Sequence, residues 1–273
     1  VWLVGTYYMN PILDPGKSCG SSGGWEPGGI CGYYDYEQIH DDLAMHAAMV
    51  YDFAFDYLSR HPHAHLKEIG KDTKSVAVEV FKRFIDIGLV RGGKSGNWNV
   101  NGWNMMLRPV LVLDSDEAYP DGKGKEYYLN LLVNESTPYH DAIPDMLKTY
   151  DPVTGLWPES PGYSFGTIQM LLDWAAPLKR AGIDIIAGNP ILQKAAMAVF
   201  PWMDDAANMV VFGDSRGGSA NFQTFENLLA YYAGITDKAG MEKVASALNK
   251  GISQKKYTRN NAGWIGLCTY TAA

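Results

Sequence analysis

The chain has 273 residues, of which 47% are hydrophobic and 19% are charged, and its formal net charge at neutral pH is −7. This length and apolar content suffice for one large folded domain or two small ones. The negative charge argues against a nucleic-acid binder, which normally displays a basic face, and no apolar run reaches the roughly eighteen residues that a membrane-spanning helix needs.

The first 35 residues form a glycine-rich segment that contains GKSCGSSGGWEPGG. The three cysteines, Cys19, Cys31 and Cys268, cannot all pair with one another; a bridge between Cys19 and Cys31 and free thiols are both open, and the spacing does not suit a metal site. The chain begins at Val1 without a basic stretch followed by an apolar one. We therefore expect either that a leader has been removed or that the chain is part of something longer.

Helical periodicity dominates the rest of the chain. Between Tyr36 and Leu58, apolar residues that include Ala47, Val50 and Tyr57 recur at spacings of three and four, which predicts an amphipathic helix of about six turns. In the next segment, Val76, Val80, Phe84 and Ile87 share one predicted face. Further helices are predicted over residues 73–89, 98–113, 123–132, 140–150, 163–181, 190–200, 222–233 and 241–248.

Strand candidates are limited to residues 208–212 and the tail after Ile252, and neither has a clear hairpin partner. The sequence therefore predicts an all-α fold of antiparallel helix pairs. We expect a glycine-rich segment over 1–35, one helical domain over 36–250 and a tail over 251–273.

One phosphate-loop motif, GxxxxGK[ST], matches residues from Gly88 to Ser95. Its mechanism needs a buried strand before the first glycine and a helix that opens at the Lys-Ser pair. The residues before Gly88 have a helical period instead, and Gly96 follows the serine directly. We favour helix capping by glycine over nucleotide binding here.

Histidines give weaker signals. His61, His63 and His65 follow a predicted helix end without acidic or cysteine companions, so a solvated loop is favoured over a metal site. Asp41 and its neighbours open a predicted helix, where acids favour the positive end of the dipole. His46 lies beside the apolar stripe of that helix and is kept as a candidate site residue.

The sequence NWNVNGWN over residues 97–104 combines amide donors with flat apolar rings at the start of a predicted helix. A single serine or aspartate would suffice as a helix cap. Carbohydrate sites need this mixture, because sugar rings stack on aromatic faces while hydroxyls and carboxylates take hydrogen bonds; helix capping plus core tryptophans is the alternative. The candidate residues are Asn97, Trp98, Asn99, Asn101 and Trp103.

The sequence GLWPESPGY over residues 155–163 places Trp157, Glu159 and Tyr163 at a loop-to-helix junction. Such junctions line a shared cleft when helix pairs form a ring. A tyrosine is a poor base in isolation, but a nearby cation or donors to the phenolate lower a tyrosine's pKa.

These two stretches, in this order and separation, resemble the heparinase II/III-like polysaccharide lyases and their alginate-lyase relatives. Asn97-Trp98 followed by Met105-Met106-Leu107 looks like the family's first motif, although the family often has a histidine where Trp98 stands. The segment from Gly155 to Tyr163 looks like the second motif. The resemblance implies an incomplete (α/α) toroid of helical hairpins, followed in the family by a C-terminal β-sandwich. We expect a chain of this length to be too short for both, so that its tail leads toward that domain.

The resemblance further implies a lyase that cleaves a uronic-acid-containing glycan by β-elimination, without a cofactor or a catalytic metal, in the periplasm or outside the cell. Asn97 would neutralise the sugar carboxylate, and Tyr163 would serve as general base, general acid or both. The remaining candidates would bind the substrate: Trp98, Asn99, Asn101, Trp103, Trp157, Glu159 and His46.

Two other functions stay open. The first is a non-catalytic carbohydrate-binding toroid. The second is a toroid glycoside hydrolase that uses paired carboxylates, for which Glu159 with Asp41 or Asp52 would be the acids.

Overall fold

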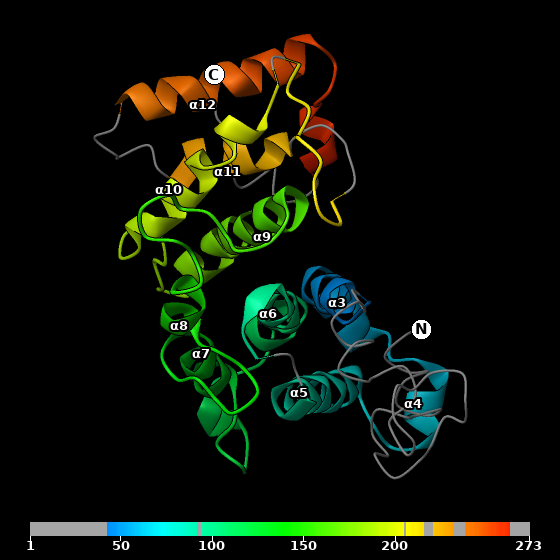
Figure 1. The fold of residues 1–273 in the computed structure, drawn as a ribbon. Coiled ribbons are helices and arrows are strands. Elements are labelled where there is room, and N and C mark those ends of the chain that lie inside the picture. The colour runs from blue at the N-terminus through cyan, green and yellow to red at the C-terminus, as the bar shows by residue number, and fades with distance from the viewer. Residues whose placement is uncertain (1–42, 92–93, 205, 216–220, 232–237, 263–273) are drawn as a thin grey trace. The chain divides into compact units, whose positions relative to one another are not determined.

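The computed structural model of the protein describes residues 43–91, 94–204, 206–215, 221–231 and 238–262. All regular structure in these ranges is helical, and pairing of β type is limited to one isolated bridge between Met203 and Met209 (Figure 1). The fold is therefore all-α, as predicted. No helix in the described part of the chain combines the length and apolarity that crossing a membrane requires.

Some predictions fall outside the described residues. These are the glycine-rich segment 1–35, the cysteines Cys19, Cys31 and Cys268, and Asp41. The helix predicted from Tyr36 is described from Leu43 onward.

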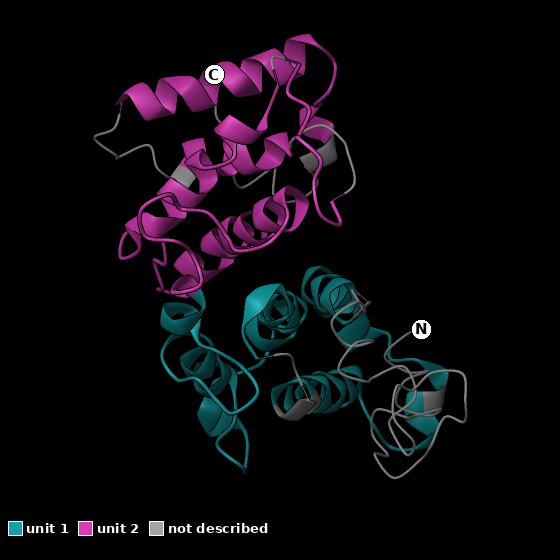
Figure 2. Cartoon of the chain, in the orientation of Figure 1, with its two compact units in different colours: residues 1–146 teal, residues 147–273 magenta. Residues whose placement is uncertain are grey.

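The chain divides into two compact units, unit 1 over Val1–Met146 and unit 2 over Leu147–Ala273 (Figure 2). The boundary falls inside the range 36–250 that the sequence predicted as one helical domain. Helical periodicity shows which face of a helix is apolar but not which helices share a core, so it carries no signal for this division.

Unit 1 is built on three long helices, and α3 packs against both α5 and α6, which also pack against each other. The α5 side chains Val76, Val80 and Phe84 are fully or almost fully buried, as their spacing predicted. α6 packs in addition against α7. The helices of this unit are α3 (Leu43–Arg60), α4 (Ala64–Glu68), α5 (Thr73–Arg91), α6 (Gly96–Leu111), α7 (Lys125–Val133) and α8 (Ile143–Leu147), the last of which reaches the boundary.

The predicted buried face of α3 is wrong. The core side chains of this helix are Ala44, Ala48 and Tyr51, whereas Val50 and Tyr57 are 63% and 60% exposed. Apolar residues occur on both sides of α3, so the period of the sequence fits either face. Packing selects the face with the small alanines, which permit close approach of the neighbouring helices.

Unit 2 centres on α9, which packs against α10 and α11, while α11 also packs against α12. Pro161 stands in the first turn of α9, where its missing N–H is not needed. The buried side chains Phe165, Ile168, Leu172 and Ala175 recur at three and four residues along α9 and form its core face. The helices of this unit are α9 (Pro161–Arg180), α10 (Pro190–Met197), α11 (Phe222–Tyr231) and α12 (Lys238–Ser253).

The first part of the segment predicted as a tail belongs to the core of unit 2. A Cβ atom on Gly251 would lie only 2.5 Å from the ring of Phe222, so this glycine allows α12 and α11 to touch. The hydroxyl of buried Tyr257 donates to Glu226 Oε2 at 2.5 Å. Arg259 Nε and Glu226 Oε1 lie 2.9 Å apart and form an ion pair. The angle at the Arg259 N–H is too far from linear for a hydrogen bond between these two atoms.

A lysine ties the same segment to the loop after α10. Lys256 Nζ donates to the carbonyl oxygen of Ala206 and, at 2.8 Å, to Asn208 Oδ1. The Asp204 carboxylate accepts hydrogen bonds from backbone N–H groups of this loop, including that of Asn208 at 2.8 Å. The strand predicted over 208–212 is thus a hydrogen-bonded loop with one bridge pair.

Candidate functional site

The junction before α9 is fixed by a buried tryptophan. Trp157 is 2% exposed, and its ring meets that of Tyr150 edge-on at a centroid distance of 4.8 Å. The backbone N–H of Trp157 donates to Ser164 Oγ at 3.3 Å. Gly155 has a positive φ of 75° and approaches the backbone of Lys194 so closely that a Cβ would lie 2.8 Å from it. The stiff composition of the loop therefore serves first to hold it in one conformation.

Glu159 lies at the edge of this buried ring. Trp157 Nε1 donates to Glu159 Oε2 at 2.9 Å. Burial raises the pKa of the Glu159 carboxyl, the hydrogen bond from Trp157 opposes that rise, and the nearby Asp214 carboxylate adds to it. Glu159 thus holds its proton to higher pH than an exposed glutamate does, which suits a proton donor.

The start of α9 is capped by a residue from far along the chain. The N-cap residue, Ser160, is buried, and its Oγ has no hydrogen-bond partner among the described residues. The backbone N–H of Gly162 instead donates to Ser215 Oγ at 2.8 Å. Gly213, with φ of 65°, lies against Ser160, where a Cβ would be 3.3 Å from the serine Cβ. A loop of residues 213–215 therefore closes over the start of this helix.

Tyr163 lies in the first turn of α9 and is 45% exposed. Its phenol is accessible to a ligand, and the sequence-predicted residues Trp157, Glu159 and Tyr163 do come together at one junction. Sequence reasoning missed Asp214 and Ser215, which follow about fifty residues later in a Gly-Asp-Ser turn and have no local signal that links them to α9.

The second candidate stretch begins α6, in unit 1. Ser95 and Gly96 both have positive φ, 64° and 65°, so the chain turns sharply before the helix. The side-chain oxygen of Asn97 is buried and has no hydrogen-bond partner among the described residues, whereas Trp98 is 41% exposed. Asn101 is half-buried.

Two other residues of this stretch face the protein interior. Asn99 is fully buried; its Oδ1 accepts from the backbone N–H of Asp141 at 3.1 Å, and its Nδ2 donates to the Asp141 carbonyl oxygen at 3.0 Å. Trp103 is 1% exposed and donates its indole N–H to the same carbonyl oxygen at 3.2 Å. Their polar groups are used by the chain itself, so we assign both a structural role in place of the predicted substrate contact. Trp157 has the same enclosed position in unit 2.

A buried histidine, His140, lies between the start of α6 and the end of α5. His140 Nε2 contacts the carbonyl oxygen of Gly88, and His140 Nδ1 lies 3.2 Å from Asn99 Oδ1. Burial lowers the pKa of the His140 imidazole, while the Gly88 carbonyl and the Asp141 carboxylate oppose that shift. The imidazole is therefore held neutral at pH 7, with Nε2 donating to Gly88.

Acidification is expected to destabilise unit 1 through His140. Because its folded-state pKa lies below the ordinary value of 6.5, the unfolded chain takes up this proton first as the pH falls. The stability that the neutral imidazole contributes is therefore fully present above about pH 6.5 and is lost as the pH falls below it. Thermal melting should show a falling Tm from about pH 7 to about pH 5, and His140→Gln should remove part of that slope. Equal slopes in the two proteins would refute this role.

The phosphate-loop match is preceded by a helix, as the sequence predicted. The expectation that Gly96 delays the next helix is wrong, because α6 begins at Gly96 with Ser95 as its N-cap. Gly88 lies inside α5, which continues to Arg91, and its carbonyl oxygen accepts from His140. Residues 92 and 93 lie outside the described part. His46 is exposed on α3, and within the described residues no group of three or more His, Cys, Asp or Glu side chains is placed to hold a metal ion.

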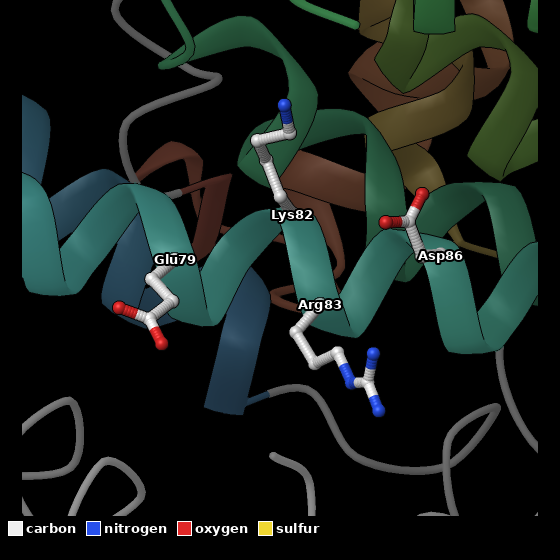
Figure 3. Close-up of a pocket in the computed structure, with 4 residues that line it drawn as sticks. All are labelled: Glu79, Lys82, Arg83 and Asp86. Carbon is white, nitrogen blue, oxygen red and sulfur yellow. The ribbon is translucent and has the colours of Figure 1, made fainter. Parts of the chain in front are cut away.

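A pocket of about 300 Å³ lies along α5, lined by Glu79, Lys82, Arg83 and Asp86 (Figure 3). Lys82 and Asp86 point to one side of the helix, and Glu79 and Arg83 point to the other. Lys82 Nζ is paired with Asp121 at 2.7 Å, and Asp86 accepts from the Tyr128 hydroxyl at 2.6 Å. The charges of the two acidic and two basic side chains that line the pocket cancel, and we assign this pocket no ligand.

The sequence-predicted residues are thus divided between the units. Asn97, Trp98, Asn99, Asn101, Trp103 and His46 belong to unit 1, and Trp157, Glu159 and Tyr163 belong to unit 2. No protein-family model, curated protein or solved structure matches this chain. The resemblance to the heparinase II/III-like lyases therefore stays a prediction.

Proposed function

We propose that the chain is a polysaccharide lyase that cleaves a uronic-acid-containing glycan, with its proton-transfer groups at the start of α9. The observation that carries this proposal is the presence, at one junction, of a Tyr163 side chain that is 45% exposed and a Glu159 carboxyl whose pKa is raised by burial. Tyr163 also lies in the first turn of α9, next to the loop that carries Glu159.

In this proposal the Tyr163 phenolate removes the proton from C5 of the uronate. The electron pair of that C–H bond forms a double bond between C4 and C5, and the bond from C4 to the glycosidic oxygen breaks. Glu159 or the newly protonated Tyr163 gives a proton to the leaving oxygen. Charge that builds up on the sugar carboxylate needs fixed hydrogen-bond donors.

The finer architecture belongs to the same proposal. We infer an incomplete (α/α) toroid, supported by the packing of consecutive helices in pairs, such as α5 with α6 and α11 with α12. The resemblance also supports a periplasmic or secreted location.

The experiment that tests the lyase is an assay with alginate, pectate, hyaluronan, chondroitin and heparan as separate substrates. β-Elimination leaves an unsaturated uronate, whose ultraviolet absorbance rises as the polymer is cut. We expect this signal with at least one of the five polymers. No ultraviolet signal with any of them, at high enzyme concentration and long incubation, would refute the proposal, and binding without turnover would select the non-catalytic reading.

A glycoside hydrolase is the second candidate, favoured by the acidic neighbour of Glu159. Burial raises the pKa of Glu159, and the nearby Asp214 carboxylate adds to that rise. Hydrolysis of a glycosidic bond uses two carboxyl groups, one of which holds its proton and acts as the acid. Of the partner acids predicted from the sequence, Asp52 belongs to unit 1 and Asp41 lies outside the described residues. New reducing ends without the ultraviolet signal, lost in Glu159→Gln, would select hydrolysis.

A further inference from the structure

The start of α6 and the segment 137–141 form one rigid joint in unit 1. The Asn99 amide holds both the N–H and the carbonyl oxygen of Asp141, as a backbone partner would. The backbone N–H groups of Tyr139 and His140 donate to Thr137 Oγ1 at 3.2 and 3.0 Å and fold the segment into a tight turn. Hydrogen bonds therefore hold the backbone of residues 137–141 against the start of α6.

Two large aromatic side chains border this joint and stay accessible. Trp98 precedes Asn99 and is 41% exposed, and Tyr139 precedes His140 and is 46% exposed. The neighbouring Trp103 is enclosed in the same unit, so exposure of the other two is not a general property of aromatics in this region. Partly exposed aromatic rings provide flat apolar area for contact with a ligand.

A lysine ammonium lies at the same joint. Lys94 Nζ donates to the Thr137 carbonyl oxygen at 3.2 Å and lies 3.6 Å from Asp141 Oδ1. The Lys94 side chain is half-exposed, and the distance to Asp141 exceeds that of a direct hydrogen bond. Because an ammonium has three donors, Lys94 can still donate to an external carboxylate.

We propose that Lys94, Trp98 and Tyr139 form a binding subsite for an acidic sugar, in which the rings contact the faces of the polymer and the ammonium meets a uronate carboxylate. We call these three residues the α6 subsite. The choice of a uronate rests on the proposed function, whereas the subsite itself rests on the joint.

The subsite is tested by binding, in the full-length chain carrying Tyr163→Phe so that turnover does not consume the ligand. The probes are tetrasaccharides of alginate and of pectate, and the same oligomers with their carboxyls reduced to alcohols. Titration calorimetry gives the affinity. Because the chain has eight tryptophans, contact with Trp98 is read from fluorescence quenching that Trp98→Ala removes.

We expect Lys94→Met to weaken binding of a carboxylated oligomer roughly tenfold, the size of one charge-assisted hydrogen bond, and to leave binding of its reduced form unchanged. Trp98→Ala should weaken binding of both forms about three- to tenfold, because stacking does not depend on the carboxyl. Lys67→Met and Tyr57→Ala, which remove an exposed lysine and an exposed ring elsewhere in unit 1, should change neither affinity.

The subsite is overturned if Lys94→Met binds all probes as the parent does, if it weakens both forms equally, or if no probe binds the parent. Thermal melting of each variant separates loss of binding from loss of folding. In the protein that retains Tyr163, an unchanged kcat/KM for the ultraviolet lyase assay in Lys94→Met and in Trp98→Ala would overturn the subsite and leave the lyase standing. Preferential binding of the carboxylated oligomers, with no lyase activity even in the protein that retains Tyr163, would overturn the lyase and leave the subsite standing.

Discussion

Tyr163→Phe is expected to lower the lyase rate by roughly 10²–10⁴-fold, the usual contribution of a positioned acid or base. The substitution removes one hydroxyl from a side chain that is 45% exposed, so the fold should be preserved. The rate of ultraviolet absorbance increase, measured at saturating polymer, gives the loss in kcat. The Kd for the polymer should stay nearly unchanged, since a proton-transfer group acts mainly in the transition state.

Tyr57→Phe is the matched control for this prediction. Tyr57 is also an exposed tyrosine on a helix, but it lies in unit 1 and stacks on His61 at a centroid distance of 4.2 Å. Its removal should leave the rate as it is. A Tyr163→Phe protein that retains more than about a tenth of the parental rate would exclude the phenol as the essential proton carrier.

Asn99→Ala is expected to destabilise the protein by about 3 kcal/mol, because it leaves the buried Asp141 N–H without an acceptor and opens a small cavity beneath α6. The Asp141 carbonyl oxygen keeps the indole N–H of Trp103 as a donor, which limits the loss. Chemical denaturation with urea should show a lower midpoint in the unit 1 transition.

Asn101→Ala provides the comparison, since it removes the same side chain from a half-buried position on the same helix. Its effect on stability should be within about 0.5 kcal/mol. If Asn99→Ala melts like the parent but loses substrate affinity, the original prediction of a sugar contact is right and the structural role is wrong.

Sequence periodicity predicted the helices well and the packing unevenly. On α5 the residues Val76, Val80 and Phe84 are the strong apolar positions, so the period identifies the buried face. On α3 two apolar faces compete, and the one with bulkier side chains, Val50 and Tyr57, is left exposed. Side-chain volume at helix contacts decides such cases, and it depends on partners that periodicity does not specify.

The site was predictable where its contacts are local. Trp157 and Glu159 are two residues apart, and one motif contains both. Asp214 and Asp141 act on residues more than forty positions away, through contacts that only the folded chain creates. An amide such as Asn99 offers the same donor and acceptor to a sugar or to a backbone, so its chemistry alone does not separate the two uses.

The anchoring of Tyr257 and Lys256 has a practical consequence for work on separate halves of the protein. A recombinant fragment that starts at Leu147 has to extend through Ala262, because ending it after α12 would strip Glu226 of its phenolic partner and release the Ala206 loop. An affinity tag is therefore better fused beyond this point than at the end of the last long helix.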